Sequence, residues 1–363
     1  MGEIVGLCAG TNTTILPANK VTGILVNVPH NGINDKAIAD TNLMFDYAGC
    51  KYRFLDTGGW QNSQAEKNGT EIRYDVSKPL ECTKTVLNLT LQHVINVMVN
   101  MNITIANALD FPIKAKGNDG ENEYEFMKKL GFNMLWARES LELRNKYCPD
   151  VELFLPIQCY NLEQLEKFLG VLGDSEFDGY SIPPRNFSTK ELVLFLLQFK
   201  KLGIKKVHLL GTTEFFTIAL AAYMARHHFD FVSLDATTWR EAAQHGQFLN
   251  QHDLTNEKIY NVFIDEDIQN DCPCPFCKGE TFTSIKELPQ TDRINHLRCH
   301  NFWVIEKAIK DLYDNSVTIM SLEKFLKRKS SDLRKIKELV DTLSLMEFYM
   351  NEDITLLQNH LLL

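Results

Sequence analysis

Residues 206–235 read KVHLLGTTEFFTIALAAYMARHHFDFVSLD, and this stretch decides the fold. The apolar run at 206–210 predicts a buried strand, residues 213–228 predict a helix, and residues 229–234 predict a second strand. Two consecutive strands that are separated by a helix of this length run parallel and are joined by a crossover. The stretch therefore predicts one strand–helix–strand unit.

The same alternation continues toward the N-terminus. Strands are expected at 21–29, 52–56, 103–111, 151–157 and 179–182, with helices at 77–99, 122–147, 162–172 and 189–202. No glycine-rich nucleotide-binding fingerprint follows the first of these strands, which weakens the case for a doubly wound sheet. Six or more units in 363 residues favour an α/β protein of the (β/α)8 TIM barrel class.

A cluster of cysteines interrupts the alternation after the last predicted strand. The segment Cys272-Pro-Cys274-Pro-Phe-Cys277 is followed, after a polar spacer, by Leu-Arg-Cys299-His300. Disulfides between cysteines this close in sequence are strained, whereas three thiolates and one imidazole suit a tetrahedral zinc ion. Such a closed site has no open position for a catalytic water, so we expect a structural zinc. The spacing leaves three candidates for the fourth ligand: His296, Cys299 and His300.

The predicted fold is thus a barrel with an inserted structural zinc-binding subdomain. We expect the main part of the barrel at 1–260, the zinc-binding subdomain at 261–305, and C-terminal helices that complete the barrel at 306–363. The last unit contains the basic segment KFLKRKSSDLRKIK at 324–337. This segment is interpreted either as a solvated helix face or as a surface that contacts phosphates.

Composition restricts the class of protein. A net charge of −9 argues against a protein that coats nucleic acid nonspecifically, although it leaves room for a local basic surface. Nine cysteines, an odd number, without a signal peptide predict a cytoplasmic protein in a reducing environment. No apolar run approaches the length of a membrane span, so no membrane partner is expected.

Three aspartates stand at or just beyond the ends of predicted strands: Asp56, Asp110 and Asp235. Any one of them alone is more often a helix cap or a turn former than a catalyst. In a TIM barrel, however, the carboxyl ends of the strands form the active site. Two carboxylates placed there can act as nucleophile and general acid/base in a double displacement. Trp60 could add an aromatic face for a flat substrate such as a purine.

These residues resemble a known family. Asp56-Thr57-Gly58-Gly59-Trp60-Gln61 is similar to the Asp-Ser-Gly-Gly-Tyr-Gln segment of tRNA-guanine transglycosylases, and the three cysteines with His300-Asn301 are similar to that family's structural zinc site. Weaker similarities span most of the chain in the same order: Asp110 after a strand, 177–180, 209–211, and Asp235 in LDATTW. The resemblance implies a (β/α)8 barrel that exchanges guanine in a polynucleotide for a 7-deazaguanine base.

The resemblance also implies roles for individual residues. Asp235 would be the nucleophile and Asp56 would handle the proton of the departing and arriving base, while Asp110 would accept hydrogen bonds from the base. The remaining base contacts would come from four residues: Trp60, Gln158, Leu210 and Gly211. His300 would complete the zinc site with Cys272, Cys274 and Cys277, and a homodimer is one further expectation from the family.

The chain departs from the family pattern at two places. Pro183-Pro184 replaces a Gly-Gly pair whose second N–H normally meets the 7-substituent of the base, and proline has no N–H. Thr237-Thr238-Trp239-Arg240 replaces the Leu-Pro-Thr-Arg segment that serves tRNA binding, and no additional RNA-binding domain is expected after the C-terminal helices. These departures favour the family's DNA-acting branch.

Three other functions are weighed against DNA modification. A tRNA-modifying enzyme would use the same site on another polymer. A non-catalytic barrel subunit would bind nucleic acid or a catalytic partner, but it would have no need of three costly carboxylates. An unrelated zinc-stabilised barrel hydrolase would need an activated water, which a closed zinc site does not supply.

Overall fold

The structure is a computed structural model of the 363-residue chain. It describes residues 1–10, 21–59, 80–82, 85–87, 90–113, 119–173, 176–250, 259–265, 272–278, 280–350 and 357. Trp60, a predicted base contact, lies outside the described residues.

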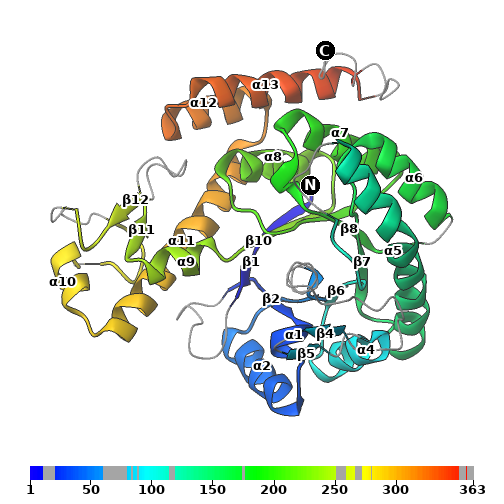
Figure 1. The fold of residues 1–363 in the computed structure, drawn as a ribbon. Helices are drawn as coiled ribbons and strands as arrows, with labels where there is room; N and C mark the ends of the chain where they lie inside the picture. The colour runs from blue at the N-terminus through cyan, green and yellow to red at the C-terminus, as the bar shows by residue number, and fades with distance from the viewer. Residues whose placement is uncertain are drawn as a thin grey trace.

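Eight parallel strands close into a barrel, which Figure 1 shows ringed by helices. The strands are β1 (Glu3–Ala9), β2 (Gly23–Asn27), β3 (Tyr52–Asp56), β6 (Ile105–Asn107), β7 (Glu152–Pro156), β8 (Gly179–Ile182), β9 (Lys206–Leu209) and β10 (Phe231–Ala236). Their order around the barrel is β1-β10-β9-β8-β7-β6-β3-β2, and β1 closes it by pairing with both β2 and β10. The predicted (β/α)8 fold is confirmed.

Helices follow the strands around the outside of the barrel. They are α1 (Val28–Asn31), α2 (Asp35–Ala48), α4 (Leu91–Asn100), α5 (Asp119–Tyr147), α6 (Leu162–Leu172), the short 3₁₀ helix η1 (Pro184–Asn186), α7 (Thr189–Lys201), α8 (Phe215–His227) and α9 (Thr238–Gln244). Polar side chains cap many of their first turns. Ser188 and Glu191, for example, form a reciprocal capping box that starts α7.

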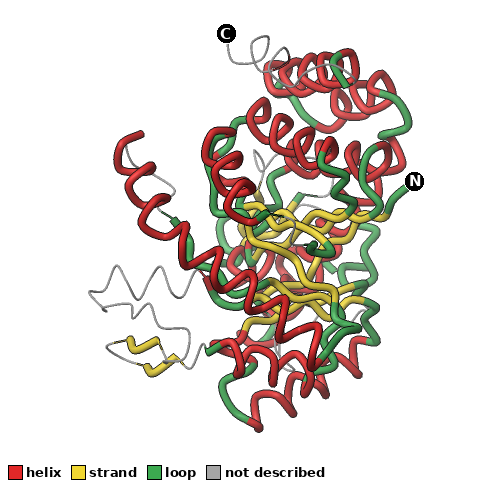
Figure 2. Tube along the Cα trace, turned by 90° about the vertical axis from the view of Figure 1, so that its right-hand side faces the viewer, coloured by secondary structure: helices red, strands yellow, loops and turns green. Residues whose placement is uncertain are grey.

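Beyond α9 the chain builds the smaller subdomain and then returns to the barrel. The elements are the hairpin β11 (Gln247–Leu249) and β12 (Ile259–Asn261), then α10 (Phe282–Glu287), α11 (Gln290–Asn315), α12 (Ile319–Lys329) and α13 (Leu333–Phe348). Helix α11 packs on α8, α9 and β1, and α13 packs on α7 and α8 (Figure 1). In the view turned by 90°, helices lie outside the strands of the barrel (Figure 2). The division at residues 260 and 305 stays a prediction, and α11 runs without a break across residue 305.

The structure corrects two local predictions. The segment EIVGLCA at Glu3–Ala9 forms β1, which the sequence analysis did not include among its strands. The helix predicted for 77–99 is wrong in its first half, because 80–82 and 85–87 pair as the antiparallel hairpin β4–β5. Helix α4 begins only at Leu91, where the Thr90 hydroxyl accepts a hydrogen bond from the His93 N–H and caps the first turn.

The inside of the barrel is apolar in its middle. Phe54, Phe154 and Phe231 lie there with Ile105 and a few aliphatic residues of β1 and β2. The Phe54 and Phe154 rings meet edge to face at 5.8 Å between centroids. A larger apolar core lies between the outer face of the strands and the surrounding helices, and both contribute side chains to it. None of the helices that the structure describes combines the length and the apolarity needed to span a bilayer.

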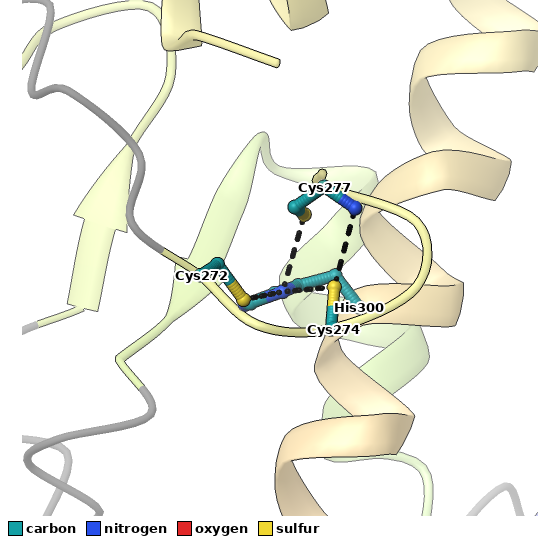
Figure 3. Close-up of side chains that lie close together, drawn as sticks. All are labelled: Cys272, Cys274, Cys277 and His300. Carbon is teal, nitrogen blue, oxygen red and sulfur yellow. Dashed lines mark hydrogen bonds between the residues drawn. The ribbon is translucent and has the colours of Figure 1, made fainter. Parts of the chain in front are cut away.

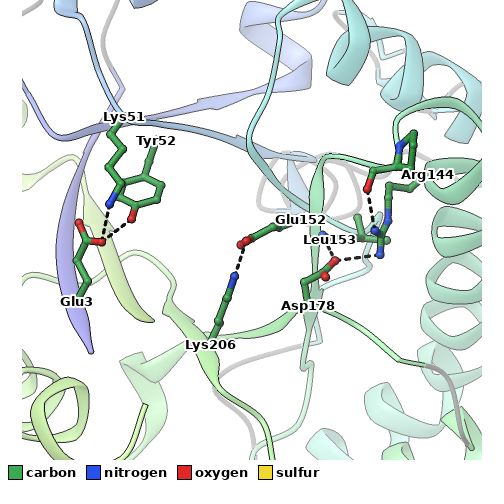
Figure 4. A network of polar contacts seen from close by, with 9 residues as sticks. Glu3, Lys51, Tyr52, Arg144, Glu152, Leu153, Asp178 and Lys206 are labelled. Carbon is green, nitrogen blue, oxygen red and sulfur yellow. Dashed lines mark hydrogen bonds and ion pairs between the residues drawn. The ribbon is translucent and has the colours of Figure 1, made fainter. Parts of the chain in front are cut away.

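Paired charges lie at the N-terminal ends of several strands (Figure 4). At the start of β1 the Glu3 carboxylate accepts hydrogen bonds from Lys51 at 2.8 Å and from the Tyr52 hydroxyl at 2.6 Å. Lys206 pairs with Glu152, and Arg144 pairs with Asp178 at 2.9 Å. Each of these acids therefore has a cationic partner at this end of the barrel.

Candidate active site and zinc site

The opposite end of the barrel gathers the three predicted aspartates. Asp56 is the last residue of β3, Asp235 lies one residue before the end of β10, and Asp110 follows β6 by three residues. The groups are close enough to interact electrostatically: the charge of Asp235 contributes to a raised pKa of Asp56, and the charge of Asp56 contributes to a raised pKa of Asp110. The fold therefore brings together three side chains that are far apart in sequence.

Asp56 is held by two donors. The Gly58 N–H donates to its Oδ2 at 3.2 Å, and the Asn107 amide donates to its Oδ1 at 3.2 Å. Burial is the main reason why its pKa is raised, and the neighbouring charge of Asp235 adds to that shift, while the Asn107 hydrogen bond opposes it. A carboxyl group in this environment can hold a proton more readily than a solvated aspartate.

Asp110 is buried against Gln158. The Gln158 amide donates to Asp110 Oδ2 at 2.7 Å, and the Thr57 hydroxyl donates to Oδ1 at 3.2 Å. Burial, and then the charge of Asp56, raise the pKa of Asp110 to about 7. A Cβ atom at Gly59 would lie 2.8 and 2.9 Å from the two carboxylate oxygens, so only glycine fits beside this group.

Asp235 receives its hydrogen bond from the loop after β9. The Gly211 N–H donates to Asp235 Oδ1 at 2.8 Å, and the His208 imidazole lies 3.3 Å from the same oxygen. Gly211 has a φ of +65°, a conformation that favours glycine. Leu210, beside it, is half-buried, and Arg185 donates to the Gly211 carbonyl at 2.9 Å.

Of the predicted base contacts, Gln158, Leu210 and Gly211 lie at this end of the barrel with the aspartates. The Gln158 Oε1 atom is buried and has no hydrogen-bond partner among the described residues. It therefore keeps an acceptor available beside Asp110, which suits a ligand that brings an N–H group.

A layer of polar side chains, not predicted from the sequence, lies just below the carboxylates. Its members are fully buried and come from the neighbouring strands β8, β9 and β10 and from β6, which lies beyond β7: Asn107, Ser181, His208 and Ser233. The Ser181 hydroxyl donates to Asn107 at 2.6 Å, and His208 Nδ1 lies 2.9 Å from the Ser233 hydroxyl. We call these four residues the polar floor. A signal existed in the sequence, because each residue is the polar one between apolar neighbours in a short strand.

The zinc-binding side chains meet as predicted. Cys272, Cys274, Cys277 and His300 are all buried, and their ligand atoms lie within 4.8 Å of one another. His300 Nδ1 is 3.4 Å from Cys272 Sγ, 3.5 Å from Cys274 Sγ and 3.4 Å from Cys277 Sγ (Figure 3). With ordinary zinc–ligand bond lengths, sulfur and nitrogen at two corners of a tetrahedron are about 3.6 Å apart. The four atoms therefore fit a closed, structural zinc site.

Contacts of the imidazole identify the fourth ligand. His300 Nε2 lies 2.8 Å from the Leu249 carbonyl, so it carries the proton and turns the Nδ1 lone pair toward the sulfurs. His296 approaches only one sulfur, Cys277 Sγ, at 3.3 Å. Cys299 is buried but does not belong to the cluster. His300 is thus the ligand that the geometry selects.

Asn301 ties the zinc site to the barrel. Its side chain accepts from the Leu249 N–H at 2.9 Å and donates to the carbonyls of Trp239 at 3.2 Å and Gln247 at 3.1 Å. Trp239 is buried in α9, and its ring meets Phe302 of α11 at 5.5 Å. Because α9 directly follows β10, the subdomain is coupled to the strand that carries Asp235.

The chain matches a family of known proteins over most of its length. The family model described as queuine tRNA-ribosyltransferase matches residues 25–332. This range includes the three aspartates, the polar floor and the four zinc ligands. A search of curated proteins returned no match to the chain.

Removal of the metal should loosen the subdomain. We expect His300→Ala or Cys274→Ser to lose bound zinc and to lower the melting temperature by about 10 °C, because folding of such sites is linked to metal binding. Zinc content by mass spectrometry and thermal unfolding are the measurements. His296→Ala and Cys299→Ser are the matched controls. Full zinc occupancy in His300→Ala would contradict this ligand set.

Ionisation of Asp110 should cost stability. Its pKa of about 7 lies above the value in an unfolded chain, so the native state retains a proton that the unfolded state has lost. The raised pKa of Asp110 therefore contributes most to the free energy of unfolding below pH 4, and this contribution is lost as pH rises toward about 7. We expect Asp110→Asn to be more stable than the wild type at pH 8, by on the order of 2 kcal/mol, and the gap to close at pH 4. Denaturant unfolding at both pH values measures the difference, and an equal gap at the two values would contradict it.

Proposed function

The chain belongs to the queuine tRNA-ribosyltransferase family. We propose that it exchanges guanine in a polynucleotide for a 7-deazaguanine base, and that this polynucleotide is DNA. The observation that carries the proposal is the meeting of Asp56, Asp110 and Asp235 at the carboxyl end of one barrel. A double displacement at the ribosyl or deoxyribosyl C1′ needs a nucleophile and a separate proton carrier.

The different surroundings of the carboxylates support different roles. Asp235 accepts a backbone N–H and is the nucleophile that attacks C1′. Asp56, whose pKa is raised mainly by burial, carries the proton between the departing and arriving bases. Asp110 accepts hydrogen bonds from the N1–H and the exocyclic amine of the base, and Gln158 lies beside it with a free acceptor. Trp60 and Leu210 enclose the base.

Two local features support DNA rather than tRNA. Trp239, in the segment that replaces the family's tRNA-binding sequence, is 1% exposed and packs against α11. Pro184 starts η1 without an N–H, so the 7-substituent must be recognised in another way than by a second glycine. Arg185 donates to the Gly211 carbonyl and is the cation adjacent to that position.

A basic surface supports a polyanionic substrate. The end of α12 and the start of α13 form what we call the basic corner: Lys327, Arg328, Lys329, Arg334, Lys335 and Lys337. Lys335 reaches Glu214, the cap of α8, at 3.5 Å. Glu214 lies three residues after Gly211, so the basic corner adjoins the end of the barrel that carries the aspartates. Five of its six side chains are exposed.

Base exchange is tested directly with labelled guanine. The wild type should introduce label into DNA and form a covalent protein–DNA adduct that survives denaturation. Asp235→Asn should lower exchange by at least about 10³-fold and form no adduct, because it lacks the nucleophile. Labelling of tRNA alone would assign the tRNA substrate instead. A folded, zinc-loaded wild type without exchange on either polymer would favour a non-catalytic subunit.

The basic corner should set the salt dependence of binding. Replacing Lys327, Arg328 and Lys329 by glutamine should weaken DNA binding and lower the slope of log K against log salt by about 0.9 for each phosphate that is no longer neutralised. Lys146→Gln is the control, because this exposed lysine lies near the end of α5, close to the ion pairs at the other end of the barrel. Fluorescence anisotropy over a salt series gives both slopes. Equal slopes in the triple variant and the control would exclude the basic corner as a phosphate-binding surface.

A further inference from the structure

His208 occupies an unusual position for an imidazole. It lies in the middle of β9, is fully buried, and stands in register between Ser181 of β8 and Ser233 of β10. Its ring lies against Phe54 with 4.4 Å between centroids. A polar side chain inside a closed barrel is costly unless both ring nitrogens have partners, so the contacts of the two nitrogens matter.

The two nitrogens face different groups. Nδ1 is 2.9 Å from the Ser233 hydroxyl, and Nε2 is 3.3 Å from Asp235 Oδ1. The Nε2 atom is buried and has no well-aligned hydrogen-bond partner among the described residues, so the carboxylate oxygen is the acceptor within its reach. If Nδ1 carried the only proton, the Nε2 lone pair would face an anionic oxygen. The arrangement therefore favours the tautomer in which Ser233 donates to Nδ1 and Nε2 carries the proton, close to Asp235 Oδ1 but not aligned with it for a hydrogen bond.

Asp235 Oδ1 thus accepts one hydrogen bond, from Gly211, and has the His208 imidazole 3.3 Å away. The Gly211 N–H approaches it from the loop after β9, and His208 approaches it from within the barrel. The other oxygen, Oδ2, has no hydrogen-bond partner in the part of the chain that the structure describes. One oxygen is fixed and the other remains available for reaction.

We propose that His208, oriented by Ser233, is a positioning residue that holds Asp235 Oδ1 inside the barrel and directs Oδ2 at the sugar carbon. This inference rests on the proposed function and deepens it. It assigns to the polar floor a task in the reaction, beyond filling the inside of the barrel.

The two displacements show where the contact acts. In the first, Oδ2 forms a bond to C1′ while the C1′–N bond breaks, and the departing base takes a proton from Asp56. In the second, the arriving base gives its proton to Asp56 and attacks C1′, and the electron pair of the C1′–Oδ2 bond returns to Asp235. Negative charge reappears on the Asp235 carboxylate in this second step. The Gly211 N–H, already bonded to Oδ1, and the nearby His208 N–H stabilise that charge with little reorganisation.

The kinetic test uses two substitutions of the same residue. His208→Leu should lower kcat for exchange by roughly 10- to 100-fold, the range for loss of a hydrogen bond to a charged group, with the KM for the free base changed by less than about threefold. His208→Gln carries an N–H near the position of Nε2 and should recover most of the loss. Val207→Ala, on the same strand but facing the outer core, controls for packing and should leave kcat unchanged. Melting temperatures identify variants that are merely unfolded.

The results separate this inference from the proposed function. Unchanged kcat in His208→Leu, or a glutamine variant no better than the leucine variant, would overturn the positioning role. A second test, by NMR spectroscopy, does not depend on exchange activity. In ¹⁵N NMR of histidine-labelled protein, we expect His208 to be protonated at Nε2 and not at Nδ1, and its Nε2 signal to shift in Asp235→Asn. Protonation at Nδ1 would overturn the inference even in an inactive protein. A wild type without exchange would reject the proposed function alone.

Discussion

Three carboxyl groups share one end of a closed barrel, and burial makes the ionisation of two of them, Asp56 and Asp110, costly. The strands end at the same edge because they are parallel, so Asp56, Asp110 and Asp235 must meet there. Neutral donors surround two of them: Asn107 and Gly58 at Asp56, Gln158 and Thr57 at Asp110. The raised pKa values of Asp56 and Asp110 follow from this arrangement. At the other end of the barrel, by contrast, Glu3, Glu152 and Asp178 are matched by cations.

The zinc subdomain supports this arrangement from outside. Its metal ligands fix the hairpin β11–β12 and the first half of α11, and Asn301 then joins α11 to α9 and β11. The second half of α11 packs on the outer face of β1. The zinc site can therefore influence the end of the barrel that carries the aspartates through the two neighbouring strands β1 and β10.

Sequence alone predicted the barrel, the zinc ligands and the three aspartates at strand ends, because strong apolar alternation and tight cysteine spacing are local signals. It missed β1, which joins the barrel through pairing with a strand more than 200 residues away. It also extended a helix through residues 80–87, where pairing between two short strands prevails over helical periodicity. The polar floor was missed because Asn107, Ser181, His208 and Ser233 acquire partners only across strands. Which of His296, Cys299 and His300 completes the zinc site depended on side-chain directions in α11, which spacing does not give.

The pairing of the first strand with the last has a consequence for how the chain is made. On the ribosome β1 emerges first, yet one of its two neighbours, β10, emerges only after the rest of the barrel has been translated. Until then the nascent barrel has two open edges, and long-range contacts of this kind form slowly. The nascent chain therefore depends on the intervening helices to shield its apolar strands until the ring of strands is complete.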